Sequence, residues 1–380
     1  MKKILILVPG YLPGFKSGGP VKTVSNMVAA LGDELCFSVL CLDTDHGNKI
    51  PYSNIEKTKW NRQGKAEVFY VARGFRGMVA IARILTTKHF DILYLNSFFS
   101  FQFSIMAMLL TQIFKGTKPS ILGPRGEFSV GAIALKPLRK RVYIYLSKLS
   151  GVYDNVIWHA STKYEADDIK RVMGTKSTVS TAIDLASPGD DIELSSRSDG
   201  NALRIIFVSR ISPKKNLFGA LSMLRMVSQK VYFDVYGPTE DKAYWTKCLD
   251  AAADLPANIF FTYCGELQPF EVAPTFVKYD LFLFPTFGEN YGHVIAEALS
   301  AGVPVLISDT TPWRNLEQTK LGWEISLDRP DHFIACIEEC CAKSADEYNK
   351  WRREIRRWAV SNIGSQAAMD ENRRLFSNLD

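Results

Sequence analysis

The sequence predicts two α/β domains, each built on a parallel sheet that helices cover on both faces. Short apolar runs alternate with amphipathic stretches along the first half, as strands and helices do in such a sheet. A polar stretch without periodicity, residues 187–201, interrupts the alternation, and the pattern begins again at Leu203. The 380 residues are enough for two domains of ordinary size.

The first half begins with a buried strand, a glycine- and proline-rich loop and a helix. The run from Lys3 to Pro9 is apolar, Gly10 to Pro20 is rich in glycine and proline, and Val21 to Leu31 has apolar residues at helical spacing. Helices separate the later strands expected here, which are Phe37 to Leu42, Val68 to Val71, Ile92 to Asn96, Ser120 to Leu122 and Val156 to Ala160.

The second half repeats the pattern. Helices are expected at Asn216 to Val227 and Gly292 to Ala301, and a charged helical stretch closes the chain at about Ala345 to Asn378. The expected strands are Leu203 to Ser209, Tyr232 to Tyr236, Ile259 to Thr262, Leu281 to Pro285 and Val303 to Ser308. We therefore expect domains at 1–186 and 202–360, a linker at 187–201 and a final helix at 361–380.

Composition indicates which kinds of binding partner and which cellular compartment to expect. A net charge of +6 suits an anionic ligand or a membrane surface, and equally a mildly basic protein with no special partner. No dense Lys/Arg stripe interleaved with aromatics is present, which argues against nucleic acid. The seven cysteines form no C-x-x-C pair, which argues against structural zinc and favours a reducing compartment. The apolar run after Lys3 is too short for a signal peptide, so we expect a cytoplasmic protein.

The most informative segment runs from Phe284 to Leu306 and reads as strand, glycine-rich loop, helix and strand. Glu289 lies in the loop, and Glu297 lies about two turns along the helix. Backbone N–H groups at the helix start attract anions, whereas carboxylates accept hydrogen bonds from hydroxyls. The pair therefore indicates a polyol ligand such as a ribose with a sugar. The alternative is that Glu289 only favours the helix dipole and Glu297 is merely exposed.

Two cations follow the first strand of the second domain. Arg210 and Lys215 both leave the carboxyl end of that strand, and Lys214 is the less suitable partner. Two cations can neutralise a diphosphate leaving group without a metal ion. The alternative is a pair of solvated loop cations.

Two loops of the first domain are further candidates. Ser17-Gly18-Gly19-Pro20 allows close backbone approach to a ligand at a helix start, although it lacks the G-x-G-x-x-G fingerprint and a simple turn is the default. Pro124-Arg125-Gly126-Glu127 follows a strand, so Arg125 or Glu127 could face a cleft between the domains. The alternative is a structural turn with an exposed ion pair.

Weaker signals favour structural roles. Asp43-Thr44-Asp45 has the form of a metal-binding Asp-x-Asp but is expected to be a polar loop, and no metal site is predicted. His159 and His293 are expected to be packed. The stretch 135–149 is a basic amphipathic helix that could lie on an anionic bilayer, but a surface helix with its apolar face toward the core is the favoured interpretation.

The spacing Glu289-x7-Glu297, followed by Ala298-Leu299 and Gly302-Val303-Pro304-Val305, resembles the hallmark of retaining glycosyltransferases of the GT-B fold, especially family 4. The resemblance implies two Rossmann-like domains whose parallel sheets face each other across a cleft. It also implies that Glu297 holds the ribose hydroxyls of the donor. Glu289 and the backbone of Asn290, Tyr291 and Gly292 would hold the donor sugar.

The same resemblance extends to other positions. It implies that Arg210 and Lys215 bind the donor diphosphate, that Gly19 lies near that diphosphate and that Gly18 lies near the acceptor. Leu267, in Gly265-Glu266-Leu267, would seat the base. Arg125 and Glu127 fit the Pro-Arg-Gly subset of family 4. The closing helix would cross back to the first domain, as it does in the family.

The activity implied is retaining transfer of a sugar from a nucleoside diphosphate sugar to a glycan or a lipid-linked glycan. A UDP-sugar is the expected donor and a GDP-sugar is the second choice. No metal ion or other cofactor is expected. Bacterial surface polysaccharide or lipopolysaccharide synthesis is the expected setting, with peripheral contact to the inner face of the plasma membrane left open. Two alternatives remain, namely a nucleotide-sugar epimerase of the same fold and a non-catalytic sugar-nucleotide-binding module. The missing glycine fingerprint disfavours an NAD-dependent oxidoreductase.

Overall fold

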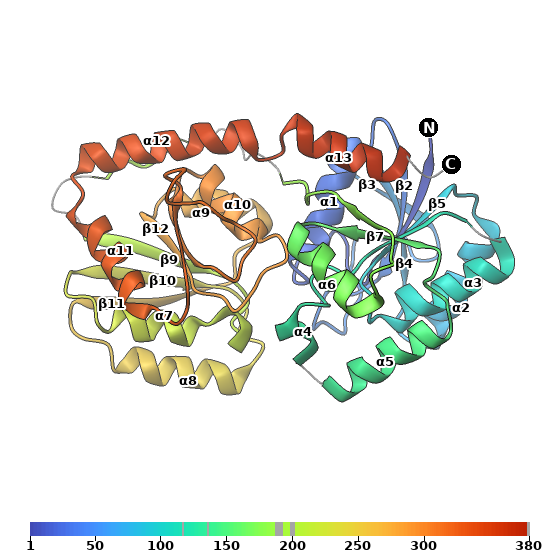
Figure 1. Cartoon of the computed structure of the whole chain (residues 1–380), viewed down its shortest axis with the longest axis horizontal. Coiled ribbons are helices and arrows are strands. Elements are labelled where there is room, and N and C mark those ends of the chain that lie inside the picture. Colours follow the sequence, from blue (N-terminus) through green and yellow to red (C-terminus); the bar gives the residue numbers. More distant parts are fainter. Residues whose placement is uncertain (116–117, 135–136, 187–192, 198–201, 378–380) are drawn as a thin grey trace. The chain divides into compact units, whose positions relative to one another are not determined.

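The computed structural model describes residues 1–115, 118–134, 137–186, 193–197 and 202–377. It divides the chain into two compact units, which are drawn in Figure 1 and described here one at a time. Unit 1 comprises Met1–Ala186 with Ser365–Asp380, and unit 2 comprises Ser187–Gly364. Most of the predicted linker, 187–201, lies outside the described residues.

Within the described residues, unit 1 contains an eight-stranded sheet in the order β3-β4-β2-β1-β5-β6-β7-β8. Neighbouring strands are parallel except β3, which pairs antiparallel with β4. The edge strands β3 and β8 were not predicted, because both are short and neither is buried. The strands are β1 (Lys3–Leu7), β2 (Cys36–Leu42), β3 (Trp60–Gln63), β4 (Ala66–Val71), β5 (Ile92–Asn96), β6 (Ser120–Gly123), β7 (Val156–Ala160) and β8 (Val179–Thr181).

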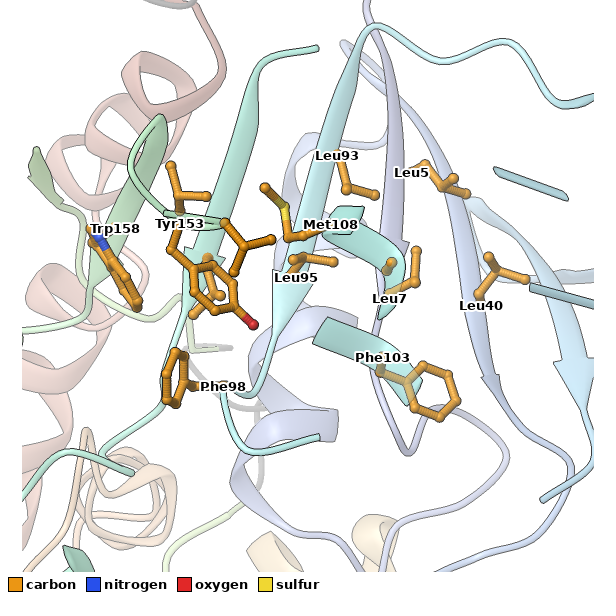
Figure 2. Close-up of a cluster of buried hydrophobic side chains, with 14 of the residues drawn as sticks. Leu5, Leu7, Leu40, Leu93, Leu95, Phe98, Phe103, Met108, Tyr153 and Trp158 are labelled. Atoms are coloured by element: carbon orange, nitrogen blue, oxygen red, sulfur yellow. The ribbon is translucent and has the colours of Figure 1, made fainter. Parts of the chain in front are cut away.

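Two core clusters cover the two faces of this sheet. On one face, alternate strand residues such as Leu5 and Leu7 pack under α2 (Phe75–Thr87), the π-helix η1 (Phe101–Ile105), α3 (Met106–Lys115), α4 (Val130–Ala134), α5 (Pro137–Leu149) and α6 (Lys163–Met173). Figure 2 shows part of this cluster. On the other face, Ile4 and Ile6 pack with α1 (Gly19–Leu31) and α13 (Gln366–Ser377). Burial on both faces explains why the strands read as continuous apolar runs.

Helix α13 completes the second of these clusters from the far end of the chain. Leu375 and Phe376 are buried there, and the Phe376 ring meets Phe37 edge-on with centroids 6.2 Å apart. The chain enters unit 1 again at Ser365, whereas 361 was the predicted start of the final helix. The closing stretch, predicted as helical from Ala345 to Asn378, is two helices, since α12 ends at Asn362 and Gly364 has a φ of 67°.

Helix α5 contradicts the favoured interpretation of its sequence. The apolar face expected against the core consists of Leu138, Val142, Tyr145, Leu146 and Leu149, and all five are exposed, from 49% to 76%. The helix instead packs on the sheet through Tyr143 and Ile144. The two residues that precede it, 135 and 136, lie outside the described residues.

Unit 2 contains a six-stranded sheet within the described residues, in the order β11-β10-β9-β12-β13-β14, with all neighbours parallel. The prediction of two α/β domains with parallel sheets is therefore confirmed, apart from β3. The strands are β9 (Leu203–Val208), β10 (Val231–Tyr236), β11 (Ile259–Gly265), β12 (Leu281–Phe284), β13 (Val305–Ser308) and β14 (Gly322–Ile325). The last of these was not predicted.

The helices of unit 2 follow the predicted alternation. Helix α7 ends at Leu224, three residues before the predicted end, and α10 begins at His293. The helices are α7 (Leu217–Leu224), α8 (Lys242–Ala253), α9 (Val272–Phe276), α10 (His293–Ser300), α11 (Pro330–Ala342) and α12 (Ala345–Asn362), with 3₁₀ turns η2 (Pro213–Lys215) and η3 (Pro269–Glu271). None of the helices in the described part of the chain has the length and apolar character needed to cross a bilayer.

Candidate active site

The carboxyl edge of the unit 2 sheet has a topological switch point. From β9 the chain proceeds to β10 on one side, whereas β12 lies on the other side of β9 and leads outward to β13. Loops that leave neighbouring strands in opposite directions open a crevice at this point, and ligands of open α/β sheets bind there. The loops that follow β9 and β12 carry Lys215 and Glu289, which the sequence selected.

Hydrogen bonds fix these two loops against each other. The Lys214 carbonyl accepts from the Phe287 N–H at 2.8 Å and from the Thr286 hydroxyl at 3.0 Å. The Asn216 side chain donates to the Pro285 carbonyl at 2.9 Å and also accepts from Gly219 N–H as the N-cap of α7. The two loops therefore form one preorganised platform, which is what a binding site on rigid elements requires.

An ion pair between Lys215 and Glu289 lies on this platform. The Lys215 ammonium donates to Glu289 Oε1, and the two side chains are only 13% and 15% exposed. The same ammonium lies 5.4 Å from the centroid of the Phe284 ring. The sequence analysis predicted that Lys215 binds the diphosphate and that Glu289 binds the sugar. In the structure the two side chains are in direct contact. A carboxylate offers about four lone-pair sites, so Glu289 can hold Lys215 and accept from a ligand hydroxyl.

Helix α10 begins beside this pair, and its N-cap residue has no side chain to cap it. Its N-cap, Gly292, has a φ of 83°, and no side chain caps the first turn. A Cβ at this position would lie 2.9 Å from Ile295 Cδ1, so both the backbone and the space favour glycine. The helix dipole favours an anion at this end. Glu297 lies on the second turn of α10 and is half-buried.

A third loop, which the sequence analysis missed, supports the other two. After β13, the Ser308 and Thr310 hydroxyls both donate to the Thr286 carbonyl, the latter at 2.8 Å. Trp313 Nε1 donates to the Tyr291 carbonyl at 2.7 Å and its ring packs against the Tyr291 ring. The sequence signal that could have revealed this loop is the polar run that follows the buried strand β13. Residues that follow parallel strands lie at the same edge of the sheet.

The remaining donor-site predictions lie on the same edge but outside the ion pair. Arg210 is exposed at the end of β9, and Leu267 is half-buried after β11. Gly237, after β10, approaches the β9 loop so closely that a Cβ would lie 1.8 Å from the Ser209 carbonyl oxygen. His293 is buried and meets the Tyr291 ring edge-on, as the packed interpretation expected.

In unit 1, Gly18 and Gly19 lie at the N-terminus of α1. Gly18 is the N-cap with a φ of 67°, no side chain caps the helix, and a Cβ on Gly18 would meet nothing within 4 Å. Asp45 orders the loop that leads to them by accepting from the Phe15 and Lys16 N–H groups at 3.0 and 3.2 Å. Because Asp45 is buried in these bonds, the interpretation of Asp43-Thr44-Asp45 as a structural polar loop agrees with the structure.

Arg125 lies in a buried polar network rather than on a surface facing a cleft. Its side chain is 5% exposed and pairs with Asp184 at 2.5 Å, and Ser161 Oγ lies 2.9 Å away. Arg125 also has a φ of 53°, which places a non-glycine residue in the left-handed region. The alternative of an exposed ion pair in this turn is also wrong, because the ion pair is buried and involves Asp184.

Glu127 secures the preceding loop. It accepts from the Ser97 hydroxyl at 2.7 Å and from the Phe98 and Phe99 N–H groups at 2.6 and 3.2 Å. Burial raises the pKa of this carboxyl, and these hydrogen bonds oppose the rise. Glu127 therefore orders backbone between β5 and the π-helix η1, and both of its carboxylate oxygens accept hydrogen bonds there.

His159 is buried next to the same network. Its ring nitrogens lie 2.8 Å from the Tyr94 hydroxyl and 2.8 Å from the Ala182 carbonyl oxygen. Burial, followed by the nearby Arg125 charge, lowers the pKa of His159 to about 3. The imidazole is therefore neutral near pH 7 and is a packed residue, as expected.

Comparison with known proteins shows which family and which solved structures this chain is similar to. Residues 190–358, which include both loops of the platform, match the family model of glycosyl transferases group 1. The fold of the whole chain is similar to that of sucrose-phosphate synthase from Thermosynechococcus elongatus, with a TM-score of 0.75, 12% identity, and coverage of 100% of this chain and 99% of that one. The chain therefore has the GT-B fold, and its residues 190–358 are similar to glycosyl transferases group 1.

Two further proteins are similar to this chain. Anabaena Alr3699/HepE, whose structure was determined in complex with UDP-glucose, has a TM-score of 0.69 and 16% identity, with 100% of both chains covered. An uncharacterized 41.2 kDa protein in the cps region of Klebsiella pneumoniae is 24% identical over 359 residues, which span 88% of this chain and 93% of that protein. At these identities, the structural similarity shows the fold alone.

Proposed function

We propose that this chain is a retaining, family 4-like glycosyltransferase that moves a hexosyl group from a nucleoside diphosphate sugar to a glycan or lipid-linked glycan acceptor. A UDP-sugar is the first choice of donor and a GDP-sugar the second. The observation that carries the proposal is the Lys215–Glu289 ion pair, which places a cation and a carboxylate together at the sheet switch point. A diphosphate sugar needs both, since one part is anionic and the other carries hydroxyls.

Two comparisons support the choice of donor and setting. Structures of Anabaena HepE hold UDP-glucose in one case and UDP with glucose in another. The Klebsiella relative comes from a cps region, which favours surface polysaccharide synthesis. Both statements describe those proteins, and for this chain they rank the candidates to be tested.

Each group of the site has a proposed role. Arg210 and Lys215 stabilise the charge on the departing diphosphate, and the N-terminus of α10 adds its backbone dipole. Glu289 and the backbone of Asn290 to Gly292 hold the sugar. In unit 1, Gly18, which has open space beside its backbone, and the exposed Gly19 are proposed to lie near the diphosphate and the acceptor.

Glu297 holds the ribose hydroxyls, and Leu267 contacts the base. Arg125 and Glu127 are proposed only to order the acceptor-side loops, because their polar atoms bind the protein itself.

The proposed reaction needs no metal ion and no covalent enzyme nucleophile. The acceptor oxygen bonds to the anomeric carbon on the face that the phosphate leaves. The sugar–phosphate bond breaks with its electron pair on the diphosphate, and the acceptor proton passes to that phosphate oxygen. The cations and helix dipole act by lowering the energy of the charge that develops there.

A ligand screen followed by thermal unfolding tests the proposal. We expect a UDP-sugar, or failing that a GDP-sugar, to raise the Tm, while ADP- and dTDP-sugars do not. Binding at a hundred times Kd stabilises by about 2.7 kcal/mol, which corresponds to a shift of roughly 5–10 °C for a domain the size of unit 2. Stabilisation by none of the four would contradict the donor site. Epimerisation of the donor without any acceptor would favour the epimerase, and an inverted anomeric configuration in the product would contradict retention.

A further inference from the structure

The outer surface of one helix layer in unit 1 is both apolar and cationic. Helices α2, α3 and α5 pack on the same core cluster and lie on one side of unit 1 in Figure 1. They form a single layer over the sheet, so their outward side chains belong to one face of the unit. We infer that this face, here called the α2–α3–α5 face, docks on a bilayer that contains anionic phospholipid.

Large apolar side chains project from every helix of the layer. Residues of a kind that ordinarily fill a core are exposed here. They are Phe75 and Val79 on α2, Leu109, Ile113 and Phe114 on α3, and Leu138, Val142, Tyr145, Leu146 and Leu149 on α5. Scattered exposed apolar residues are ordinary, but a concentration on one helix layer marks an interaction surface.

The charge on this face has one sign. Helices α2, α4 and α5 and the run from Phe101 to Lys115 contain no aspartate or glutamate. The exposed cations are Arg76 and Arg83 on α2 and Arg139, Arg141 and Lys148 on α5. Cations that flank apolar side chains match the anionic headgroups and acyl chains of a leaflet, whereas a protein partner would need an equally one-sided acidic and apolar surface.

Helix α6, in the same layer, shows what an ordinary solvated helix of this unit looks like. Its outer residues mix the two charges, with Lys163 and Lys170 beside Asp167 and Asp168, and Tyr164 is its one large exposed apolar residue. The contrast shows that neither the fold nor the layer requires the composition of the α2–α3–α5 face. Helix α6 also supplies a matched control.

This inference deepens the proposed function, because an enzyme that glycosylates a lipid-linked acceptor must work at a bilayer. The two can fail separately. Vesicle binding requires no donor, and the donor screen requires no lipid. A protein that binds a UDP-sugar but not vesicles would contradict only the bilayer inference.

Vesicle co-sedimentation of the full chain provides the test. We expect binding to vesicles of phosphatidylcholine mixed with phosphatidylglycerol, and little binding to phosphatidylcholine alone. Raising the salt from about 0.1 M to about 1 M, which shortens the Debye length from about 10 Å to about 3 Å, should weaken the binding strongly. The triple variant Arg139→Glu/Arg141→Glu/Lys148→Glu should bind at least on the order of a hundredfold more weakly, since each cation near an anionic leaflet contributes roughly fivefold.

Two further variants make the result specific. Leu138→Ser/Leu146→Ser/Leu149→Ser should also lose binding, whereas the α6 control Lys163→Glu/Lys170→Glu should keep it. All these side chains are exposed, so we expect unchanged Tm values in every variant. Equal binding by the α5 and α6 variants, or no binding by the native chain, would overturn the inference. So would a native dimer that the leucine variant converts to a monomer without any vesicle binding, since a second copy would then cover the face.

Discussion

Replacing Lys215 by alanine removes the cation from a largely buried ion pair and leaves Glu289 on the platform without its partner. A hydrogen bond to a charged group contributes about 1.5–3 kcal/mol. Exposed pairs contribute less than about 1 kcal/mol, whereas breaking a fully buried pair costs about 3–5 kcal/mol. At 13% and 15% exposure the pair lies between these limits. We therefore expect Lys215→Ala to destabilise unit 2 by about 2 kcal/mol, or roughly 4–8 °C in Tm.

The catalytic effect of the same change should be larger than its effect on stability. If Lys215 stabilises the departing diphosphate, its loss should lower kcat by about 100–1,000-fold, as for other single groups that stabilise developing charge. Release of the nucleoside diphosphate measures kcat, and urea unfolding measures the free energy of unfolding. Lys214→Ala is the matched control, because Lys214 joins the platform through its backbone carbonyl.

A double-mutant cycle separates the two roles of the pair. Lys215→Ala, Glu289→Ala and the double variant should show a coupling of about 1–2 kcal/mol in the free energy of unfolding, since the side chains are in contact. A kcat for Lys215→Ala within about threefold of the native value, with the donor still saturating, would refute the diphosphate role. Absence of coupling would refute the ion pair itself.

Three further predictions concern the backbone, the buried network and pH. Gly292→Ala should lower the free energy of unfolding by about 1–3 kcal/mol, because alanine is strained at this positive φ. The same change should weaken donor binding. An unchanged Kd by calorimetry would argue against a ligand at the start of α10. Arg125→Ala leaves the Asp184 carboxylate buried without its cation. It should lower the free energy of chemical unfolding by about 3–5 kcal/mol. A decrease of less than about 1 kcal/mol would show that the network tolerates the unpaired Asp184 charge. The pKa of His159 is about 3 in the folded chain and near 6.5 unfolded, so only the unfolded state binds a proton between these values. The contribution of the neutral imidazole to stability is complete above pH 6.5 and is lost as the pH falls toward 3. Unfolding experiments should therefore show that the free energy of unfolding depends less steeply on pH in this range for His159→Gln than for the native chain.

Local patterns in the sequence predicted the interior of the sheets well and their margins poorly. The strands β5 and β7 were predicted to the residue, because burial on both faces makes the whole segment apolar. By contrast, β3 lies at an edge and pairs antiparallel after a tight turn at Gly64, so its sequence, Trp60–Gln63, is mostly polar. Edge strands carry little periodic signal because only part of one face is buried.

The platform shows a similar division. Sequence spacing placed Glu289 and Lys215 in loops that follow strands and Glu297 on the next helix, because positions relative to strand ends are local properties. The contact of Lys215 with Glu289 joins segments 74 residues apart and could not be read from either segment. Likewise, the α5 sequence shows an amphipathic helix, but periodicity does not tell which of its two faces the rest of the chain will cover.

The return of α13 to unit 1 affects the order in which the protein can be completed during synthesis. Strands β1 and β2 leave the ribosome before any part of unit 2, and domains generally begin to fold as they emerge. The sheet face that contains Ile4 and Val39, however, is covered in part by Leu375 and Phe376, which are translated after the whole of unit 2. Unit 2 is one continuous segment, so all of its residues are translated before α13. The unit whose synthesis starts earlier is therefore the one that is completed later, and part of its interior stays uncovered until α13 has been made.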